Sequence, residues 1–186
     1  MELILASNSP RRREILHSLG YSFKVIPSLF DEKGVSFSAQ DMARELAYLK
    51  AKEVFDRENR ENIVVLGADT IVLLDDKILG KPKNREEAFN MLKSLSNKTH
   101  LVITGYALIL DGKEIKGEDV SKVTFNELSD EFINEYIDNK RPFDKAGSYG
   151  IQDGYDLVKS LNGSFDNVVG LPSEKIGDIL KEIFIK

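Results

Sequence analysis

The longest buried stretch that the hydrophobic pattern predicts lies at residues 63–82, IVVLGADTIVLLDDKILGKP. Its two apolar runs are rich in β-branched residues and predict a strand inside a sheet that is covered on both faces. The polar residues of 67–70 interrupt this strand, and 75–77 turn the chain back into a short hairpin. We expect this hairpin to bring Asp69 and Lys81 towards the same region.

Shorter patterns predict the other elements. Apolar runs and alternation predict strands at 3–6, 23–27, 101–110, 114–126 and 155–161. Helical spacing after capping residues predicts helices that begin near Ser9, Ser38, Asn84, Ser129 and Pro172. Glycine-containing loops are expected at 143–152 and 167–172. Strands and helices mix without strict alternation, which predicts an α/β fold: a mixed, partly antiparallel twisted sheet with flanking helices, in two lobes around a central cleft. The whole chain, 1–186, is expected to form this single two-lobed domain.

Composition narrows the class of protein. The chain has 186 residues, of which 41% are hydrophobic and 31% charged, and it contains no cysteine. Disulfides, thiolate nucleophiles and cysteine zinc sites are therefore excluded. No apolar run is long enough to span a membrane, and the N-terminus lacks the pattern of a secretory signal, so we expect a cytoplasmic protein. The net charge of −5 argues against nucleic acid or an anionic membrane as a partner.

Several carboxylates are candidates for chemistry. Asp69 lies beside a buried strand, where a carboxylate is costly unless a cation, a metal or several hydrogen bonds compensate it. The alternative is a bulge in which Asp69 bonds to nearby backbone. Asp31 and Glu32 form an acidic pair in a loop. One of them is a candidate for holding a divalent cation, and the alternative is a solvated pair.

Basic residues open the first predicted helix. Ser9 is a suitable cap and Pro10 suits the first helical position, which places Arg11, Arg12 and Arg13 in the first turn. A helix N-terminus disfavours cations unless an anion is bound there by backbone N–H groups and guanidinium groups together. The alternative is a solvated basic end of the chain.

The remaining chemistry is that of acids and cations. His17 and His100 lie in different elements without a recognisable partner, and the chain has no Walker A, HExxH or GxGxxG motif. What is left is a set of carboxylates and cations: Glu32, Asp69, Arg11, Arg12, Lys50, Lys81 and Lys145. Such a set suits metal-assisted hydrolysis of a phosphate ester or anhydride, although a lone helical lysine such as Lys50 is commonly just solvated.

An ordered set of short motifs resembles one known family. The motifs are LASNSPRR, the loop acids 31–32, LAYLKA, GADTIV, GKPKN, THLVITG and DKAGSYGIQ followed by NGSFDNVVGLP. Together they are similar to the Maf family of nucleoside triphosphate pyrophosphatases, in the family's order and over nearly the whole chain. Each motif alone is weak, whereas the ordered set is specific.

The resemblance implies a fold, a reaction and a set of roles. The fold would be related to the inosine triphosphate pyrophosphatases, and the reaction would split a nucleoside triphosphate into monophosphate and pyrophosphate with Mg²⁺ or Mn²⁺. Asp69 would be the catalytic acid-base residue or a metal ligand, and Glu32 would assist the metal or the water. The phosphates would be held by Ser7, Arg12, Lys50 and Lys81. The family also leads us to expect a homodimer.

The branch of the family is indicated by three positions. This chain has Arg11, Thr70 and Gln152 and is similar to the dTTP/UTP branch at these positions, whereas the 7-methyl-GTP branch has Trp, Gln and Glu there. The amide of Gln152 offers both a donor and an acceptor, as the edge of uracil or thymine requires. The resemblance therefore implies dTTP and UTP as substrates, with modified pyrimidine triphosphates as further candidates.

Two other functions remain open at this stage. The first is a binding or regulatory protein, because the family is also linked to inhibition of septum formation. In such a protein, the nucleotide site would act as a sensor that regulates cell division. A nucleotidyltransferase is disfavoured because no motif for a second substrate is present.

Overall fold

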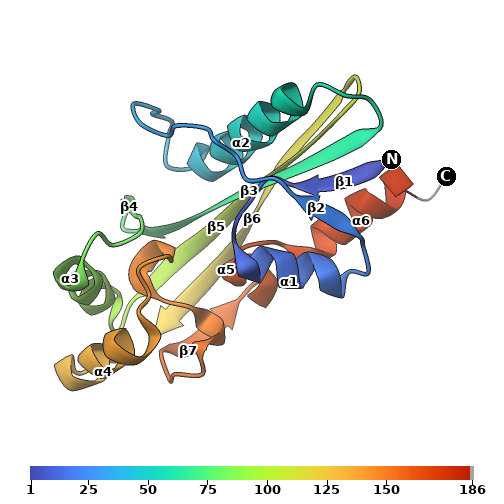
Figure 1. The fold of residues 1–186 in the computed structure, drawn as a ribbon. Helices are drawn as coiled ribbons and strands as arrows, with labels where there is room; N and C mark the ends of the chain where they lie inside the picture. The colour runs from blue at the N-terminus through green and yellow to red at the C-terminus, as the bar shows by residue number, and fades with distance from the viewer. Residues whose placement is uncertain (185–186) are drawn as a thin grey trace. The chain divides into compact units, whose positions relative to one another are not determined.

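The computed structural model, which describes residues 1–184, contains a seven-stranded sheet with helices packed against it (Figure 1). The strands are β1 (Glu2–Leu5), β2 (Phe23–Val25), β3 (Ile63–Leu74), β4 (Lys77–Leu79), β5 (Thr99–Leu110), β6 (Lys113–Phe125) and β7 (Val158–Asn162). The helices are α1 (Pro10–Ser18), α2 (Met42–Glu58), α3 (Arg85–Leu95), α4 (Asp130–Lys140), α5 (Phe165–Val169) and α6 (Ser173–Phe184), with 3₁₀ turns η1 (Ala146–Ser148) and η2 (Ile151–Asp153).

The sheet is mixed, which confirms the predicted fold class. Its strand order is β2-β1-β3-β5-β6-β7, with β4 paired to β3. β1 runs parallel to β2 and β3, whereas β4 is antiparallel to β3 and β7 is antiparallel to β6. No helix within residues 1–184 combines the length and the apolar character needed to cross a membrane.

The chain divides into two compact units. The first unit comprises Met1–Asp69, Thr104–Asp119 and the described part of 170–186. The second unit comprises Thr70–Ile103 and Val120–Val169. Strands β3, β5 and β6 therefore contribute residues to both units.

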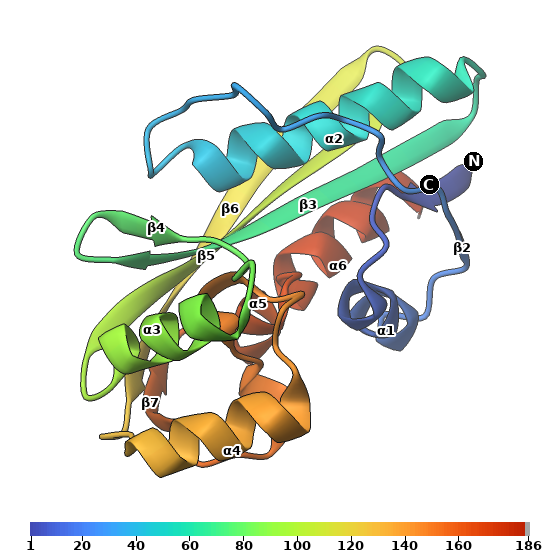
Figure 2. The same ribbon diagram turned by 60° about the vertical axis from the view of Figure 1, so that its left-hand side comes forward.

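In the first unit, α2 covers one face of the strands, and α1 and α6 lie on the other (Figures 1 and 2). The α2 side is an apolar core built from alternate strand positions and the inner face of the helix: Ile4, Ala6, Ala51, Val54, Ile63, Val65, Ala107 and Ile109. Two glycines allow α2 to approach closely, because a Cβ at Gly67 would collide with the carbonyl of Ala47 and one at Gly105 with the backbone of Ala43.

In the second unit, α3 and α4 lie side by side (Figure 2). Both helices begin at predicted caps: the side chain of Asn84 accepts the N–H of Glu87, and that of Ser129 accepts the N–H of Phe132. Their apolar faces join a core of strand and loop residues that includes Val72, Leu92, Phe125, Ile133, Tyr136 and Tyr149.

The predicted interruption of the central strand at 67–70 is wrong. β3 is continuous from Ile63 to Leu74, because Gly67 lies under α2 and the charge of Asp69 is compensated by Lys50 of the same helix. The expected hairpin follows, with Asp75 and Asp76 both at positive φ (47° and 62°), as tight two-residue hairpin turns require.

The chain after β6 also differs from expectation. Part of the loop predicted at 167–172 is helical, since α5 covers Phe165–Val169 and is capped by the hydroxyl of Ser164, which accepts the N–H of Asn167. A helix of five residues is too short to produce a helical period in the sequence. The strand predicted at 155–161 begins later, at Val158.

The close packing of α2 generates a prediction for stability. We expect Gly105→Ala to lower the free energy of unfolding by about 1–3 kcal/mol, because the new methyl group must displace the helix backbone at Ala43. Urea denaturation with an unchanged m-value measures this loss. Gly80→Ala is the matched control, since a Cβ at Gly80 meets nothing within 4 Å. Equal stability of the two variants would contradict the close approach.

Candidate functional site

The first part of the candidate site lies where parallel strands β1 and β3 run together. Leu5 pairs with Leu66, and the N–H of Ala6 donates to the carbonyl of Leu66 (2.8 Å). Ser7 follows directly after β1, and Asp69 lies three residues beyond Leu66 on β3. The carboxyl end of β1 therefore lies beside the middle of β3, close to Asp69.

The loop from Ser7 into α1 is organised around hydroxyl groups. The hydroxyl of Ser7 accepts the N–H of Ser9 (3.2 Å), and the hydroxyl of Ser9 accepts the N–H of Arg12 (3.4 Å), with Pro10 at the start of the helix. The predicted cap is therefore confirmed. Arg11 lies half-buried in the first turn of α1.

Arg12 is held rigidly at this helix start. Its Nε donates to the carbonyl of Gly170 (2.7 Å), and its Nη1 donates to the hydroxyl of Ser7 (3.2 Å). Burial lowers the pKa of the Arg12 guanidinium; the charge of Asp69 opposes this shift and that of Arg11 adds to it. Arg12 remains a cation at neutral pH and is fixed beside the first backbone N–H groups of a helix.

Lys50 joins two carboxylates. Its Nζ lies 2.5 Å from Oδ1 of Asp69 and 2.7 Å from Oε1 of Glu32. Asp69 and Lys50 are largely buried, with side chains 14% and 18% exposed, whereas Glu32 is 51% exposed. Alternation along β3 puts Asp69 on the same face as Gly67, which lies under α2, so the helix brings Lys50 directly to it.

The same carboxylates determine whether a divalent metal fits. Glu32 and Asp69 each place one carboxylate oxygen within 2.7 Å of the same ammonium group, so the two carboxylates lie close to one another. Within residues 1–184, no three His, Cys, Asp or Glu side chains gather as a complete metal cage. Two carboxylates, with substrate phosphates and water as further ligands, are how proteins usually hold Mg²⁺, so the residues fit such an ion.

The other four predicted residues belong to the second unit. Thr70 is the next residue after Asp69 on β3, and Lys81 follows β4 with an exposed side chain. Lys145 precedes η1 and forms an ion pair with Asp144 (3.0 Å). Gln152 is the exposed middle residue of η2.

One backbone hydrogen bond links two of these segments. The N–H of Gly147 donates to the carbonyl of Gly80 (3.1 Å), which joins the strand end before Lys81 to the turn after Lys145. Gly147 has φ 70° and packs against Val72, so a glycine is required there. This bond brings the segments of Lys81 and Lys145 together within the second unit.

Buried aromatic residues that the sequence analysis did not select support the segment 147–153. Nε2 of His100 lies 2.7 Å from the hydroxyl of Tyr149, and the two rings meet edge to face with Phe125. The hydroxyl of Tyr136 contacts both Gly150 and Asp153. Burial raises the pKa of Tyr136 and Tyr149, so both hydroxyls stay protonated.

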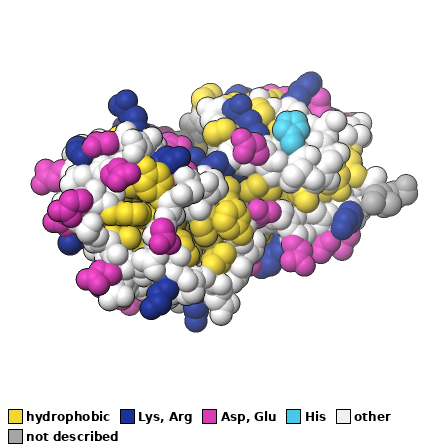
Figure 3. Space-filling view, turned by 90° about the horizontal axis from the view of Figure 1, so that it is seen from below, with side chains coloured by type: hydrophobic (Ala, Val, Ile, Leu, Met, Phe, Trp, Pro, Cys, Tyr) yellow, Lys and Arg dark blue, Asp and Glu magenta, His cyan; other side chains and the backbone are white. Residues whose placement is uncertain are grey.

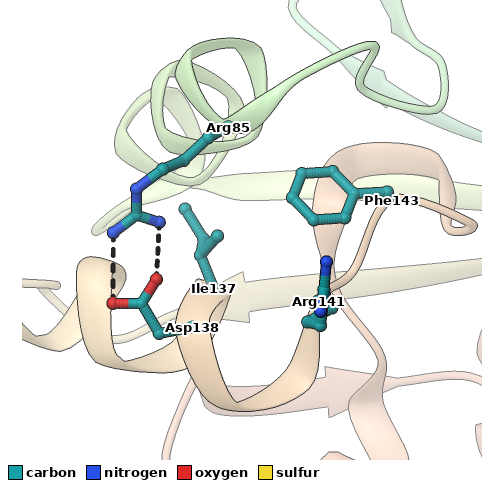
Figure 4. A pocket seen from close by; sticks show the side chains of 5 residues that line it. All are labelled: Arg85, Ile137, Asp138, Arg141 and Phe143. Carbon is teal, nitrogen blue, oxygen red and sulfur yellow. Dashed lines mark hydrogen bonds and ion pairs between the residues drawn. The ribbon is translucent and has the colours of Figure 1, made fainter.

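A pocket of about 280 Å³ lies beside α3 and α4, and none of the predicted site residues lines it (Figure 4). It is lined by Arg85, Ile137, Asp138, Arg141 and Phe143. Arg85 reaches Asp138 with both terminal nitrogens (3.0 and 3.3 Å), so the carboxylate already compensates its charge. Arg141 is the second basic residue that lines the pocket.

The face of the molecule seen in Figure 3 carries acidic and basic side chains interspersed with apolar ones. A nucleic-acid-binding face is typically a continuous basic patch or stripe. The mixed charges of this face do not form that pattern.

Comparison with protein families gives one match over almost the whole chain. A model described as "Maf-like protein" matches residues 2–183. A dTTP/UTP pyrophosphatase of Alkaliphilus oremlandii is 51% identical over 98% of this chain and 96% of its own length. A dTTP/UTP pyrophosphatase of Thermococcus onnurineus is 50% identical over 92% of both chains.

Solved structures show the same fold at low identity. A nucleoside-triphosphatase/dITP/XTP pyrophosphatase from Mycobacterium abscessus aligns over 99% of both chains with a TM-score of 0.50 and 14% identity. The Ham1 protein of Staphylococcus aureus aligns over 68% of this chain and 73% of its own with a TM-score of 0.50 and 16% identity. These two structures support the fold assignment.

The buried histidine generates a prediction for pH dependence. Burial lowers the pKa of His100 from 6.5 to about 4. Between pH 4 and pH 6.5, His100 binds a proton in the unfolded chain but not in the folded chain. The contribution of neutral His100 to the free energy of unfolding is therefore complete above pH 6.5 and is lost as pH falls towards 4. The expected loss is about 3 kcal/mol in the free energy of unfolding, measured by denaturation across that range.

Two variants separate this contribution from that of the carboxylates. His100→Phe should flatten the pH dependence between 4 and 6.5 relative to the unchanged protein, whereas substitution of the exposed His17 by Gln should retain it. Parallel curves for the unchanged protein and His100→Phe would contradict the assignment to His100.

Proposed function

The chain belongs to the Maf-like protein family, as its ordered motifs predicted, and we propose that it is a nucleoside triphosphate pyrophosphatase that hydrolyses dTTP and UTP. The observation that carries this proposal is the identity of 44–51% with several curated dTTP/UTP pyrophosphatases along nearly their entire length. The paired carboxylates beside fixed cations in the first unit agree with such chemistry.

The phosphates are bound by the residues at the start of α1. Arg12 supplies a charge that is held in place by Gly170 and Ser7, so little conformational entropy is lost when an anion binds. Ser7 supplies a hydroxyl beside the same helix end. Arginine and backbone N–H groups together form the donor arrangement that phosphate oxygens favour.

The bond that breaks is the anhydride bond between the α- and β-phosphates. A water oxygen forms a bond to the α-phosphorus, the bridging oxygen leaves with pyrophosphate, and the water gives up its proton. Asp69 accepts that proton or orients the water, and Glu32 assists. Lys50, Lys81 and Lys145 neutralise the charge that develops on the oxygens of the triphosphate.

A divalent cation, Mg²⁺ or Mn²⁺, would be held by Asp69 and Glu32. The cation supplies charge neutralisation on the phosphate oxygens when bound. Lys50 contacts both carboxylates, so it keeps the pair close together before the ion binds.

Selection of the base falls to residues other than those that hold the phosphates. Gln152 offers one amide donor and one acceptor to the edge of uracil or thymine. Thr70 adds a hydroxyl and Arg11 a guanidinium. Modified pyrimidine triphosphates with the same edge are further candidates.

The setting of the enzyme is also part of the proposal. We expect the two units to act as one functional domain over 1–186, in the cytoplasm, and as a homodimer. Analytical ultracentrifugation tests the dimer, and fractionation of cells tests the location.

The first experiment measures pyrophosphate release from dTTP, UTP, CTP, GTP, ATP and 7-methyl-GTP with Mg²⁺. We expect turnover of dTTP and UTP, and Asp69→Asn should lower kcat by about 10²–10⁴-fold because the amide accepts no proton. Asp76→Asn is the matched control: Asp76 is exposed in a hairpin turn at φ 62°, which asparagine tolerates.

Three results decide between the functions. A preference for 7-methyl-GTP would refute the roles of Arg11, Thr70 and Gln152 and leave the reaction intact. Equal turnover by Asp69→Asn and the unchanged protein would refute the role of Asp69. Tight binding of a triphosphate without turnover would favour a nucleotide-sensing regulator of septum formation.

A further inference from the structure

The turn that carries Gln152 is the feature from which we draw a further inference. Gln152 is the central residue of η2, and its side chain is exposed. A Gln amide pairs with uracil in one orientation and with cytosine in the reversed orientation, because the donor and acceptor positions of the two bases are exchanged. Selection between these bases therefore requires the amide to be held in one place.

Tyr136 of α4 contacts both ends of this turn with one hydroxyl group. The hydroxyl accepts the N–H of Gly150 (2.9 Å) and donates to Oδ2 of Asp153 (2.6 Å). The N–H of Asp153 in turn donates to the carbonyl of Gly150 (3.1 Å). Tyr136 thus closes a ring of three hydrogen bonds around Ile151 and Gln152.

The shape of the turn depends on a missing side chain. A Cβ at Gly150 would lie 2.8 Å from both carboxylate oxygens of Asp153. The absence of this atom allows the carboxylate to fold back towards the hydroxyl of Tyr136.

The residue before the turn is anchored separately. Tyr149 is 5% exposed, and its hydroxyl lies 2.7 Å from Nε2 of His100. Its ring meets that of Phe125 edge to face, with the centroids 4.7 Å apart. The residue directly before the turn therefore has a side chain that is fixed in the core.

Burial of the tyrosine rings does not account for these contacts. The ring of Tyr136 is fully buried and packs edge to face on Tyr155, and a phenylalanine would provide the same packing. The hydroxyl group is a polar atom inside the core, and its two partners both belong to the turn of Gln152. Its contribution is to the position of that turn.

We propose that Tyr136 is a positioning residue for base selection: its hydroxyl, with the Tyr149–His100 contact before the turn, holds Gln152 where its amide distinguishes uracil from cytosine. This inference rests on the proposed function, in which Gln152 contacts the base. Tyr136 itself is buried and acts only through the turn.

The test compares Tyr136→Phe with Tyr155→Phe. We measure kcat/KM for UTP and CTP and expect Tyr136→Phe to lower the preference for UTP about tenfold, through a rise in KM for UTP, because the turn loses its anchor. Tyr155→Phe is a matched control, since the hydroxyl of Tyr155 accepts a hydrogen bond from the exposed side chain of Asn139, outside the turn (2.8 Å). It should retain the preference.

A double-mutant cycle with Gln152→Ala distinguishes positioning from general damage. If Tyr136 acts through Gln152, Gln152→Ala should change the preference for UTP much less in the Tyr136→Phe background than in the unchanged protein. Additive effects would overturn the inference. Amide hydrogen exchange at 150–153 should also become faster in Tyr136→Phe, and unchanged exchange would overturn it independently of activity.

Failure of the proposed function gives a different result. In that case Gln152→Ala would leave the preference among triphosphates unchanged in the otherwise unaltered protein. If Gln152→Ala lowers the preference and Tyr136→Phe does not, the proposed function stands and the positioning role of Tyr136 is refuted.

Discussion

The ion pair between Lys50 and Asp69 is the interaction on which the candidate site depends. A carboxylate within a strand whose neighbours are almost all buried is costly unless a cation lies beside it. The ammonium of Lys50 supplies that charge at 2.5 Å from Asp69 and also contacts Glu32 of the loop before α2, at 2.7 Å. Loss of Lys50 would leave a largely buried negative charge on β3 without its compensating ammonium.

The packing of α2 explains how this pair forms. Helix α2 approaches the sheet over Gly67 and Gly105, where any side chain would meet helix backbone. Lys50 lies between Ala47 and Ala51, which are both fully buried against the strands. The small residues bring the helix close enough for the lysine side chain to reach Asp69, two residues beyond Gly67 on the same face. The glycines are therefore a requirement of the site as well as of the core.

Most of the fold was predictable because the signals are local. Apolar periodicity located the strands and helices, and the capping side chains of Ser9, Asn84 and Ser129 fixed three helix starts. The continuity of β3 was not predictable, because the partner of Asp69 lies 19 residues earlier in the chain. The contacts of Tyr136 and His100 were missed for the same reason. A tyrosine within an apolar helix face has the pattern of a core residue, and only the folded chain shows which backbone its hydroxyl contacts.

The proposed function uses different residues for the triphosphate and for the base, and this separation has a chemical basis. All nucleoside triphosphates share the triphosphate group, so the residues proposed to bind and cleave it serve any base. Of these, Ser7, Arg12, Glu32, Lys50 and Asp69 belong to the first unit, and Lys81 and Lys145 to the second. The base edges differ by single donors and acceptors, so their selection demands an accurately placed amide rather than more charge. The second unit contains the segment 147–153, anchored by three aromatic residues in its own core. In the proposed function, the residues that anchor the segment of Gln152 differ from those that bind the triphosphate, so substitutions in the anchor are expected to change base selection while the phosphate chemistry is preserved.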